Sequence, residues 1–325
     1  MKLLHSAISI HGLFILLGCS GKPAETAGFR VGLVTPGSIA DAAWNSGAYS
    51  GLEEIRDSLA VNVSHVEART PSEQEEALRT YAAQGYNLVF GHGFEFQGAA
   101  ERVSAQYPKT AFVVTSGERV QGNVSPLIFR LHEASYLAGM VAGGMTRTNT
   151  IGFVGGIELP PIKLAEDAWV AGARAVNPKV TPRSTYLNTF DDVAAGREAA
   201  IALLQAGVDM FHHNADQAAL GVFQAVKESP GAFIFGANLD QSALAPARVL
   251  GSAVIDLPRA FLTIAKEVRA GGFQPTIESF GLKSGVIRYE ANSALESSLP
   301  EALRQRVAAA RDSIIAADTV RATTP

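Results

Sequence analysis

Short apolar runs alternate with longer amphipathic segments from Phe29 onward, and this alternation constrains the fold more than any other feature of the sequence. A repeated strand and helix pattern is typical of α/β proteins built on parallel sheets. In the first half, the expected strands are 29–34, 62–67, 87–90, 111–115 and 124–129. The expected helices between them are 45–59, 71–84 and 97–106. These elements predict one Rossmann-like lobe.

The alternation starts again after residue 129 and predicts a second lobe of similar size. Its expected helices are 132–145, 163–176, 191–206 and 218–228, and its expected strands are 150–155, 181–187, 209–214 and 232–237. The tail departs from this pattern, with expected strands at 249–255, 278–282 and 286–289 and expected helices at 258–270 and 300–317. Because such a tail can return to both lobes, we predict a bilobal α/β protein.

The N-terminus has the features of an export signal. A short basic start, Met1-Lys2, precedes an apolar stretch at residues 8–17. The stretch ends in Leu16-Leu-Gly-Cys19, which resembles the bacterial lipobox, and Cys19 is the only cysteine. We therefore predict a signal peptide at 1–18 and a lipidated tether at 19–28, with the alternative that Cys19 is a buried free thiol. The mature protein would then be lipid-anchored on the extracytoplasmic face of the cell membrane.

Composition narrows the range of partners. The 325 residues carry a formal net charge of −4 and are 47% hydrophobic, which suits about two ordinary domains. The mild acidity and the lack of basic clusters argue against a nucleic-acid partner. Beyond the N-terminus no apolar run approaches the roughly 20 residues of a membrane span. We therefore expect a globular, monomeric body.

A candidate ligand site lies in the stretch Asp41-Ala-Ala-Trp-Asn-Ser-Gly-Ala-Tyr-Ser-Gly-Leu52, which follows the first expected strand. Ligands of open α/β sheets bind at the carboxyl ends of strands. Asp41, Trp44, Asn45 and Tyr49 provide a carboxylate, an amide and two aromatic rings, which suit a flat, hydrogen-bonding organic ligand. The alternative is a capped amphipathic helix with Asp41 as its N-cap and the aromatic residues in the core.

The sequence offers little support for catalysis or for a cofactor. Ser46, Ser116 and Ser252 lack a Gly-x-Ser-x-Gly elbow, and residues 152–156 lack the spacing of a dinucleotide fingerprint. His212, His213 and Asp216 could suggest a metal. Adjacent residues of a strand point to opposite faces, however, so we expect no metal site. One imidazole should face the cleft and the other the packing of the sheet.

His132-Glu133, at the start of an expected helix, could form an acid–base pair. We favour instead a role in capping the helix and in hydrogen bonds between the lobes.

Several motifs in order carry a resemblance to a known family. They are Asp41–Asn45 with Tyr49–Leu52, Gly91-His-Gly-Phe94, Phe129-Arg-Leu-His-Glu-Ala-Ser-Tyr-Leu-Ala-Gly139, Ile151-Gly-Phe-Val-Gly-Gly156, Ala171-Gly-Ala-Arg-Ala-Val-Asn-Pro178, Gly221-Val-Phe-Gln-Ala225 and Gly236-Ala-Asn-Leu-Asp-Gln241. On these motifs the chain resembles the basic-membrane-protein family of ABC-transporter substrate-binding lipoproteins, whose best-characterised members bind purine nucleosides. The resemblance covers about residues 29 to 290.

The resemblance implies a type I periplasmic-binding-protein fold in which three crossovers join two Rossmann-like lobes. The implied first lobe comprises 29–127 and 256–280, and the implied second lobe 128–255 and 281–318. It further implies a receptor without catalytic activity or cofactor that works with a membrane permease and an ATPase. The small-molecule ligand would be a purine nucleoside or a purine base. The implied ligand-binding residues are Asp41, Trp44, Asn45, Tyr49, Gly93, Phe94, His212, His213, Asn238 and Lys283.

One residue and one segment depart from the family pattern. Asn238 stands where family members usually have an aspartate that binds the ribose hydroxyls, so charge-assisted bonds at this position are lost. The segment Phe211-His-His-Asn-Ala-Asp216 replaces a small, glycine-rich loop. These departures keep two alternatives open. One is a receptor for another small polar ligand such as a sugar, and the other is a ligand-sensing module without transport.

Overall fold

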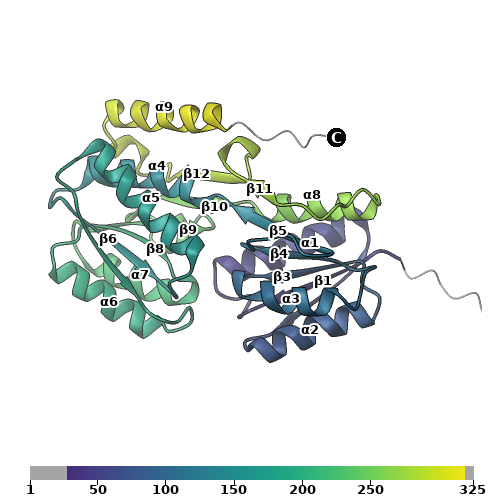
Figure 1. Ribbon diagram of the computed structural model, residues 1–325. Coiled ribbons are helices and arrows are strands. Elements are labelled where there is room, and N and C mark those ends of the chain that lie inside the picture. Colours follow the sequence, from purple (N-terminus) through teal and green to yellow (C-terminus); the bar gives the residue numbers. More distant parts are fainter. Residues whose placement is uncertain (1–27, 319–325) are drawn as a thin grey trace, which may run out of the picture.

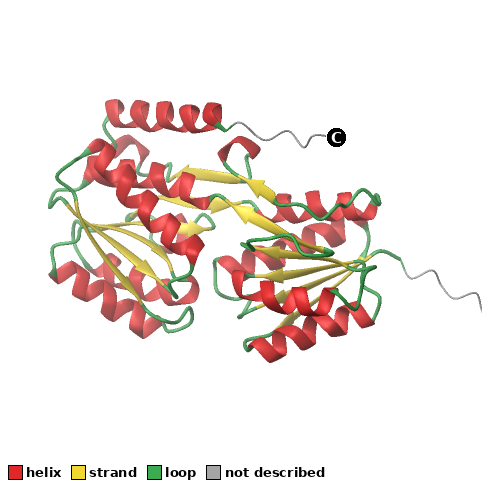
Figure 2. Cartoon of the chain, in the orientation of Figure 1, coloured by secondary structure: helices red, strands yellow, loops and turns green. Residues whose placement is uncertain are grey.

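The computed structural model describes residues 28–318, and the chain forms two α/β lobes that lie side by side (Figure 1). Each lobe is built on one six-stranded sheet. Figure 2 shows helices on both faces of each sheet, so the strands are enclosed between helical layers. The bilobal α/β architecture that the alternating segments predict is confirmed. The signal peptide and lipobox predicted at residues 1–19 lie outside the described residues.

In the sheet of the first lobe, every strand is parallel to its neighbours. The strand order is β11 (Glu278–Phe280), β5 (Val124–Phe129), β4 (Ala111–Thr115), β3 (Leu88–His92), β1 (Arg30–Thr35) and β2 (Asn62–Glu67). The helices of this lobe are α1 (Trp44–Leu59), α2 (Pro71–Ala83), α3 (Gln97–Ser104) and α8 (Leu257–Arg269). Helix α1 packs on α8, and α2 packs on α3.

The second lobe has the same plan with one antiparallel edge, since β12 pairs antiparallel with β10. The strand order is β12 (Ile287–Ala291), β10 (Val249–Ile255), β9 (Phe233–Asn238), β8 (Met210–Asn214), β6 (Thr150–Gly155) and β7 (Thr181–Tyr186). The helices are α4 (Leu131–Met145), α5 (Pro160–Val176), α6 (Val193–Gln205), α7 (Ala219–Glu228) and α9 (Glu301–Ala317). Within residues 28–318, the helices lack the length and apolar character that crossing a bilayer requires.

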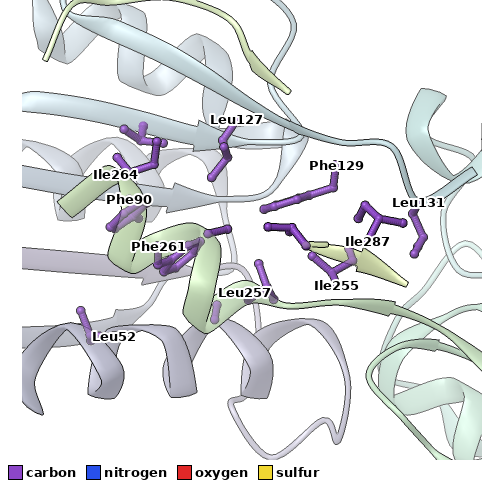
Figure 3. Close-up of a cluster of buried hydrophobic side chains, with 14 of the residues drawn as sticks. Leu52, Phe90, Leu127, Phe129, Leu131, Ile255, Leu257, Phe261, Ile264 and Ile287 are labelled. Carbon is purple, nitrogen blue, oxygen red and sulfur yellow. The ribbon is translucent and has the colours of Figure 1, made fainter. Parts of the chain in front are cut away.

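Within the described residues, the chain crosses between the lobes three times, from β5 to α4, from β10 to α8 and from β11 to β12. Strand β5 continues to Phe129, so the first crossing lies slightly beyond the expected boundary at residue 127. Five buried side chains at these crossings, which we call the hinge cluster, pack in one apolar core (Figure 3): Phe129, Leu131, Ile255, Leu257 and Ile287. Full burial of each such side chain stabilises the fold by about 1.5–3 kcal/mol.

Helices α4 and α5 approach so closely that glycine is required on both. A Cβ atom on Gly139 would lie 2.1 Å from the carbonyl oxygen of Trp169, and one on Gly172 would lie 2.0 Å from the carbonyl oxygen of Tyr136. Both contacts are with backbone, which cannot move without separating the helices. The pair therefore fixes the distance between α4 and α5.

Within residues 28–318, three histidines are fully buried, His92 in β3 and His212 and His213 in β8. Burial disfavours the charged imidazolium and lowers the pKa of His92 and His212 to about 3 and that of His213 to about 4. All three are therefore neutral in the folded protein at neutral pH.

Replacement of Gly139 by alanine should destabilise the fold by at least about 2 kcal/mol, because the new methyl group overlaps the backbone of α5. Urea unfolding followed by circular dichroism measures this change. The matched control is Gly98→Ala on α3, where the nearest atom is the mobile end of Arg102, 3.3 Å away. The control should be neutral or slightly stabilising because alanine favours a helix. Equal stability of both variants would contradict the close approach of α4 and α5.

The buried histidines predict a loss of stability in mild acid. An unfolded histidine takes up a proton near pH 6.5, while these three stay neutral until about pH 3 or 4 in the folded state. Lowering the pH from 7 to 5 should therefore cost up to about 2 kcal/mol per histidine, and stability should be recovered as the pH rises above 6.5.

The midpoint of urea unfolding at pH 7 and pH 5 tests this prediction. The His213→Gln variant, which keeps a hydrogen-bond donor in place, should lose less stability over the same interval than the unaltered protein. Equal changes of midpoint in His213→Gln and in the unaltered protein would contradict the burial of this ring.

Candidate ligand-binding site

A cavity of about 390 Å³ lies between the two lobes, beside the hinge cluster. This volume is within the range of small-molecule sites, about 300–1,000 Å³. The cavity is bordered by residues that follow the carboxyl ends of β3, β4, β8 and β9, where open α/β sheets bind their ligands. Its apolar and aromatic wall comprises Pro36, Trp44, Phe94, Ile128, Phe129, Leu131, Leu159, Pro160, Pro161, Ile162, Leu164, Phe190 and Ile255.

Trp44, at the start of α1, is held in the cavity wall by His92. The two rings stack with centroids 4.0 Å apart, and Phe129 meets the indole edge-on at 6.0 Å. His92 Nε2 lies 3.0 Å from the backbone oxygen of Trp44, and Nδ1 lies 3.0 Å from the hydroxyl of Thr115. Because a carbonyl oxygen only accepts, Nε2 donates and Nδ1 accepts from Thr115. His92 thus fixes both the ring and the backbone of Trp44.

Asp41 caps the N-terminus of α1. Its carboxylate accepts hydrogen bonds from the backbone N–H groups of Ala43, Asn45 and Ser46 at 3.0, 2.7 and 2.9 Å. An acidic group at a helix N-terminus satisfies free donors and interacts favourably with the helix dipole. Asp41 is buried and is not part of the cavity wall. The capping role considered for Asp41 in the sequence is therefore the one that the structure shows.

Asn45 and Tyr49, the other two candidates of this helix, lie away from the cavity wall. Asn45 is buried, and its side-chain oxygen has no hydrogen-bond partner within residues 28–318. Tyr49 packs edge-on against His65 with ring centroids 5.5 Å apart. The interpretation of Tyr49 as an aromatic wall is therefore wrong. The rings that complete the wall beside Trp44 are those of Phe94, Phe129 and Phe190.

Gly93 and Phe94, which follow β3, both line the cavity as expected. Gly93 has a backbone φ of +146°, and a Cβ atom there would lie 2.5 Å from the carboxylate of Glu95. Glycine thus allows the Glu95 side chain to fold back against this loop and border the cavity. The Glu95 side chain is open to the cavity, but the surrounding protein desolvates its carboxylate, and this desolvation raises its pKa.

The expectation that one imidazole of β8 faces the cleft is wrong, because His212 and His213 are both fully buried and border no part of the cavity. His212 bonds Ser135 at 3.1 Å and the backbone oxygen of Phe235 at 3.2 Å. His213 bonds the side-chain oxygen of Gln241 at 2.9 Å. Within residues 28–318, no group of three or more histidine, cysteine or acidic residues is arranged to hold a metal ion.

Lys283 lies at the third crossover, as its place in the sequence suggested, but its ammonium group does not reach the cavity. It is exposed and donates a hydrogen bond to the backbone oxygen of Asp318 at 2.9 Å. Its assignment to the ligand is therefore wrong. Glu133 braces this crossover instead, since its carboxylate accepts the backbone N–H of Leu282 at 2.7 Å. This agrees with the structural role preferred for His132-Glu133, although His132 also borders the cavity.

The polar part of the cavity wall is rich in hydrogen-bond acceptors. It comprises Glu95, Ser116, Glu118, His132, Asn214, Asp216 and Asn238. Sequence reasoning selected Asn238 and considered Asp216 only as a metal ligand. It missed Glu95 and Glu118. No lysine or arginine is among the described residues that line the cavity, so the site is unsuited to a phosphate group.

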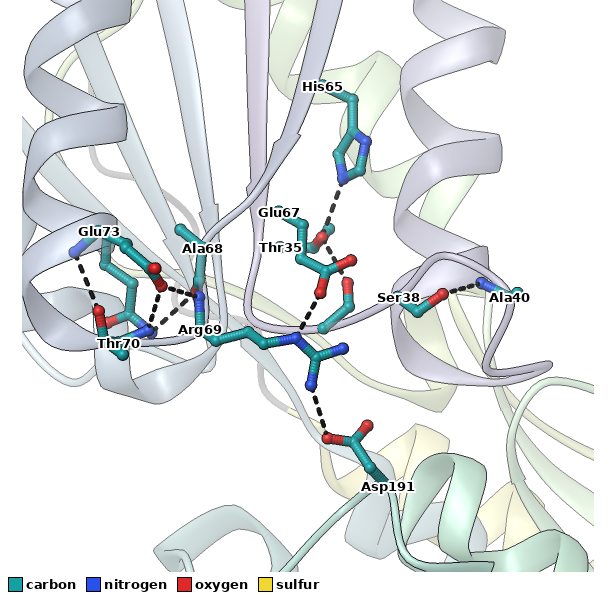
Figure 4. A network of polar contacts seen from close by, with 12 residues as sticks. Thr35, Ser38, Ala40, His65, Glu67, Ala68, Arg69, Thr70, Glu73 and Asp191 are labelled. Atoms are coloured by element: carbon teal, nitrogen blue, oxygen red, sulfur yellow. Dashed lines mark hydrogen bonds and ion pairs between the residues drawn. The ribbon is translucent and has the colours of Figure 1, made fainter.

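In the part of the chain that the structure describes, two polar contacts join the lobes at the edge of the cleft. Arg69 of the first lobe pairs with Asp191 of the second at 3.0 Å (Figure 4). The Gln241 side chain donates to the backbone oxygen of Ala42 at 3.3 Å, and the same side chain carries the bond to His213. Gln241 thus connects His213 to the first lobe.

Comparison with known proteins agrees with this geometry. The sequence profile of the Bmp family, described as ABC transporter substrate-binding protein PnrA-like, matches residues 29–318. The chain is 28% identical over 339 residues to the ABC transporter nucleoside-binding protein BmpA of Lactococcus lactis subsp. cremoris, covering 95% of each protein. It is 30% identical over 284 residues to basic membrane protein A of Borreliella afzelii, covering 85% of this chain and 87% of that protein.

Among solved structures, an ABC transporter solute-binding protein from Aeropyrum pernix K1 superposes with a TM-score of 0.80 at 24% identity, over 89% of this chain and 91% of the other. This likeness confirms the predicted periplasmic-binding-protein fold. The match of the family profile to nearly the whole described chain decides the relationship. The chain belongs to the Bmp family of ABC-transporter substrate-binding proteins.

Proposed function

We propose that the chain is the receptor through which an ABC importer takes up a purine nucleoside or a free purine base. The observation that carries the proposal is the cavity between the lobes, which combines an aromatic wall with a row of hydrogen-bond acceptors. The relative from Lactococcus lactis named as nucleoside-binding supports the same class of ligand. Anchoring through a lipidated Cys19 belongs to this proposal.

The aromatic wall suits a flat heterocycle. A base stacked on an aromatic side chain gains about 1–3 kcal/mol. Trp44 is already fixed by His92, so little ordering is required when a base binds. With hydrogen bonds from the acceptors of the wall to amino and hydroxyl groups, the total can reach about 8 kcal/mol, which corresponds to micromolar affinity.

Closure of the lobes about the three crossovers would enclose the ligand and present a closed surface to the permease and its ATPase. The ion pair of Arg69 and Asp191 is about half exposed on both sides. Such pairs contribute about 0–1 kcal/mol, so the rim can open at small cost. Contacts between the ligand and both walls of the cavity would then decide the balance between open and closed forms.

We propose no catalytic role for this site. Ser135 and His212 share a hydrogen bond, as a nucleophile and its base would. Both are fully buried in the second lobe and do not border the cavity. Burial also lowers the pKa of His212 to about 3, far from the value that suits a general base at neutral pH.

Replacement of Trp44 by alanine should weaken purine binding by more than tenfold, because it removes the ring that borders the cavity and stacks on His92. Titration calorimetry with inosine and adenine measures the change. The matched control is Tyr49→Ala on the same helix, whose ring packs on His65 instead. The control should keep its affinity within about threefold, which is about 0.7 kcal/mol. Unchanged affinity in Trp44→Ala would refute the placement of the ligand.

A further inference from the structure

The start of α5 gives the cavity a second apolar surface, separate from its aromatic rings. Five residues of one short segment after β6, which we call the α5 wall, border the cavity: Leu159, Pro160, Pro161, Ile162 and Leu164. Their side chains are aliphatic or proline, whereas the rings suited to stacking on a base come from other elements. The α5 wall is therefore additional to the stacking surface for a base.

The backbone N–H groups of the α5 wall between residues 159 and 163 are already bonded. A helix N-terminus ordinarily has unpaired N–H groups that bind polar or anionic groups. Pro160 and Pro161 carry no N–H. The N–H of Leu159 donates to the backbone oxygen of Ile157 at 2.8 Å, and the first two N–H groups after the prolines donate to the Leu159 oxygen at 3.0 and 2.9 Å. This helix N-terminus is thus unsuited to a polar group of the ligand.

The charged side chain of this segment lies away from the cavity. Lys163 does not border it, and its ammonium group pairs with Glu166 at 3.3 Å and with Asp167, both further along α5. With neither a charge nor a free N–H on the cavity side, the α5 wall can recognise apolar groups only.

The α5 wall is open to solvent and yet rigid. Leu164 is 49% exposed, and Pro160 is also exposed. Ile162 is buried in the core of the second lobe, the proline rings restrict the backbone, and the close contact with α4 fixes the helix. Single exposed apolar residues are common on proteins, but a group of them beside a cavity marks a binding surface. An apolar group that covers this surface would remove it from water at little cost in ordering.

We propose that the α5 wall is a subsite for a short apolar substituent of the ligand, an alkyl or thioether group carried by the purine or by its sugar. Outside the stacked faces of the base, an unsubstituted nucleoside presents hydroxyl groups and polar ring edges, which gain little from such a wall. This inference rests on the proposed function and deepens it, because it names apolar purine derivatives as the preferred class of ligand.

Titration calorimetry of the full chain compares adenosine with isopentenyladenosine and 5′-methylthioadenosine, which carry the apolar group on the base and on the sugar. At least one derivative should bind about tenfold more tightly than adenosine, a gain that corresponds to burial of about two methylene groups. A gain of less than about threefold for both derivatives would overturn the subsite and leave the proposed function standing. Absence of binding of all three compounds would overturn the proposed function together with the subsite.

The Leu164→Ser variant assigns the preference to the α5 wall. Because Leu164 is about half exposed, the variant should fold. It should weaken binding of the preferred derivative at least about threefold more than binding of adenosine. The matched control is Ile157→Ser, which removes an apolar side chain that is 39% exposed and does not border the cavity, and it should keep the preference.

Two results with Leu164→Ser would overturn the subsite. An undiminished preference for the derivative would show that the α5 wall does not contact the apolar group. An equal loss of affinity for adenosine and for the derivative would show that Leu164 acts in closure of the lobes and not in recognition of the substituent.

Discussion

The packing of the three crossovers into one apolar cluster is the constraint on which the rest of the structure depends. Phe129, Leu131 and Ile255 belong to the hinge cluster and also border the cavity. Phe129 further contacts the indole of Trp44. A ligand that contacts this part of the cavity wall therefore also contacts side chains of the hinge between the lobes. This shared use gives a physical reason for coupling between occupancy of the cavity and the angle between the lobes.

Much of the fold could be predicted from the sequence, because strand and helix periodicities alternate without interruption over both lobes. The resemblance implies a first boundary between the lobes at residue 127, whereas β5 continues to Phe129. Other features depend on contacts between distant segments and leave no local signal. The antiparallel pairing of β12 with β10 is one such feature. The backbone approach of α4 to α5 at Gly139 and Gly172 is another, since a glycine in a helix does not reveal what lies across from it.

The candidate site was only partly predictable. Gly93, Phe94 and Asn238 border the cavity because they stand at strand ends, which a sequence can locate, and Trp44 borders it from the start of α1. The two histidines of β8 do point to opposite faces, but β8 is a central strand covered on both faces, so neither could reach the cleft. Tyr49 and Lys283 lie on the expected elements and point elsewhere. Asp216 contacts Asn238 in the cavity wall because the sheet order places β8 beside β9, which the sequence does not reveal.

A calorimetric titration series on the unaltered mature protein tests most directly whether the cavity between the lobes receives a purine. The series compares inosine and adenosine with hypoxanthine, uridine and common sugars at one pH and salt concentration. We expect a dissociation constant of about 1 μM or lower for a purine nucleoside, and much weaker binding of uridine and sugars. Binding of a sugar alone, or of no purine at all, would contradict it.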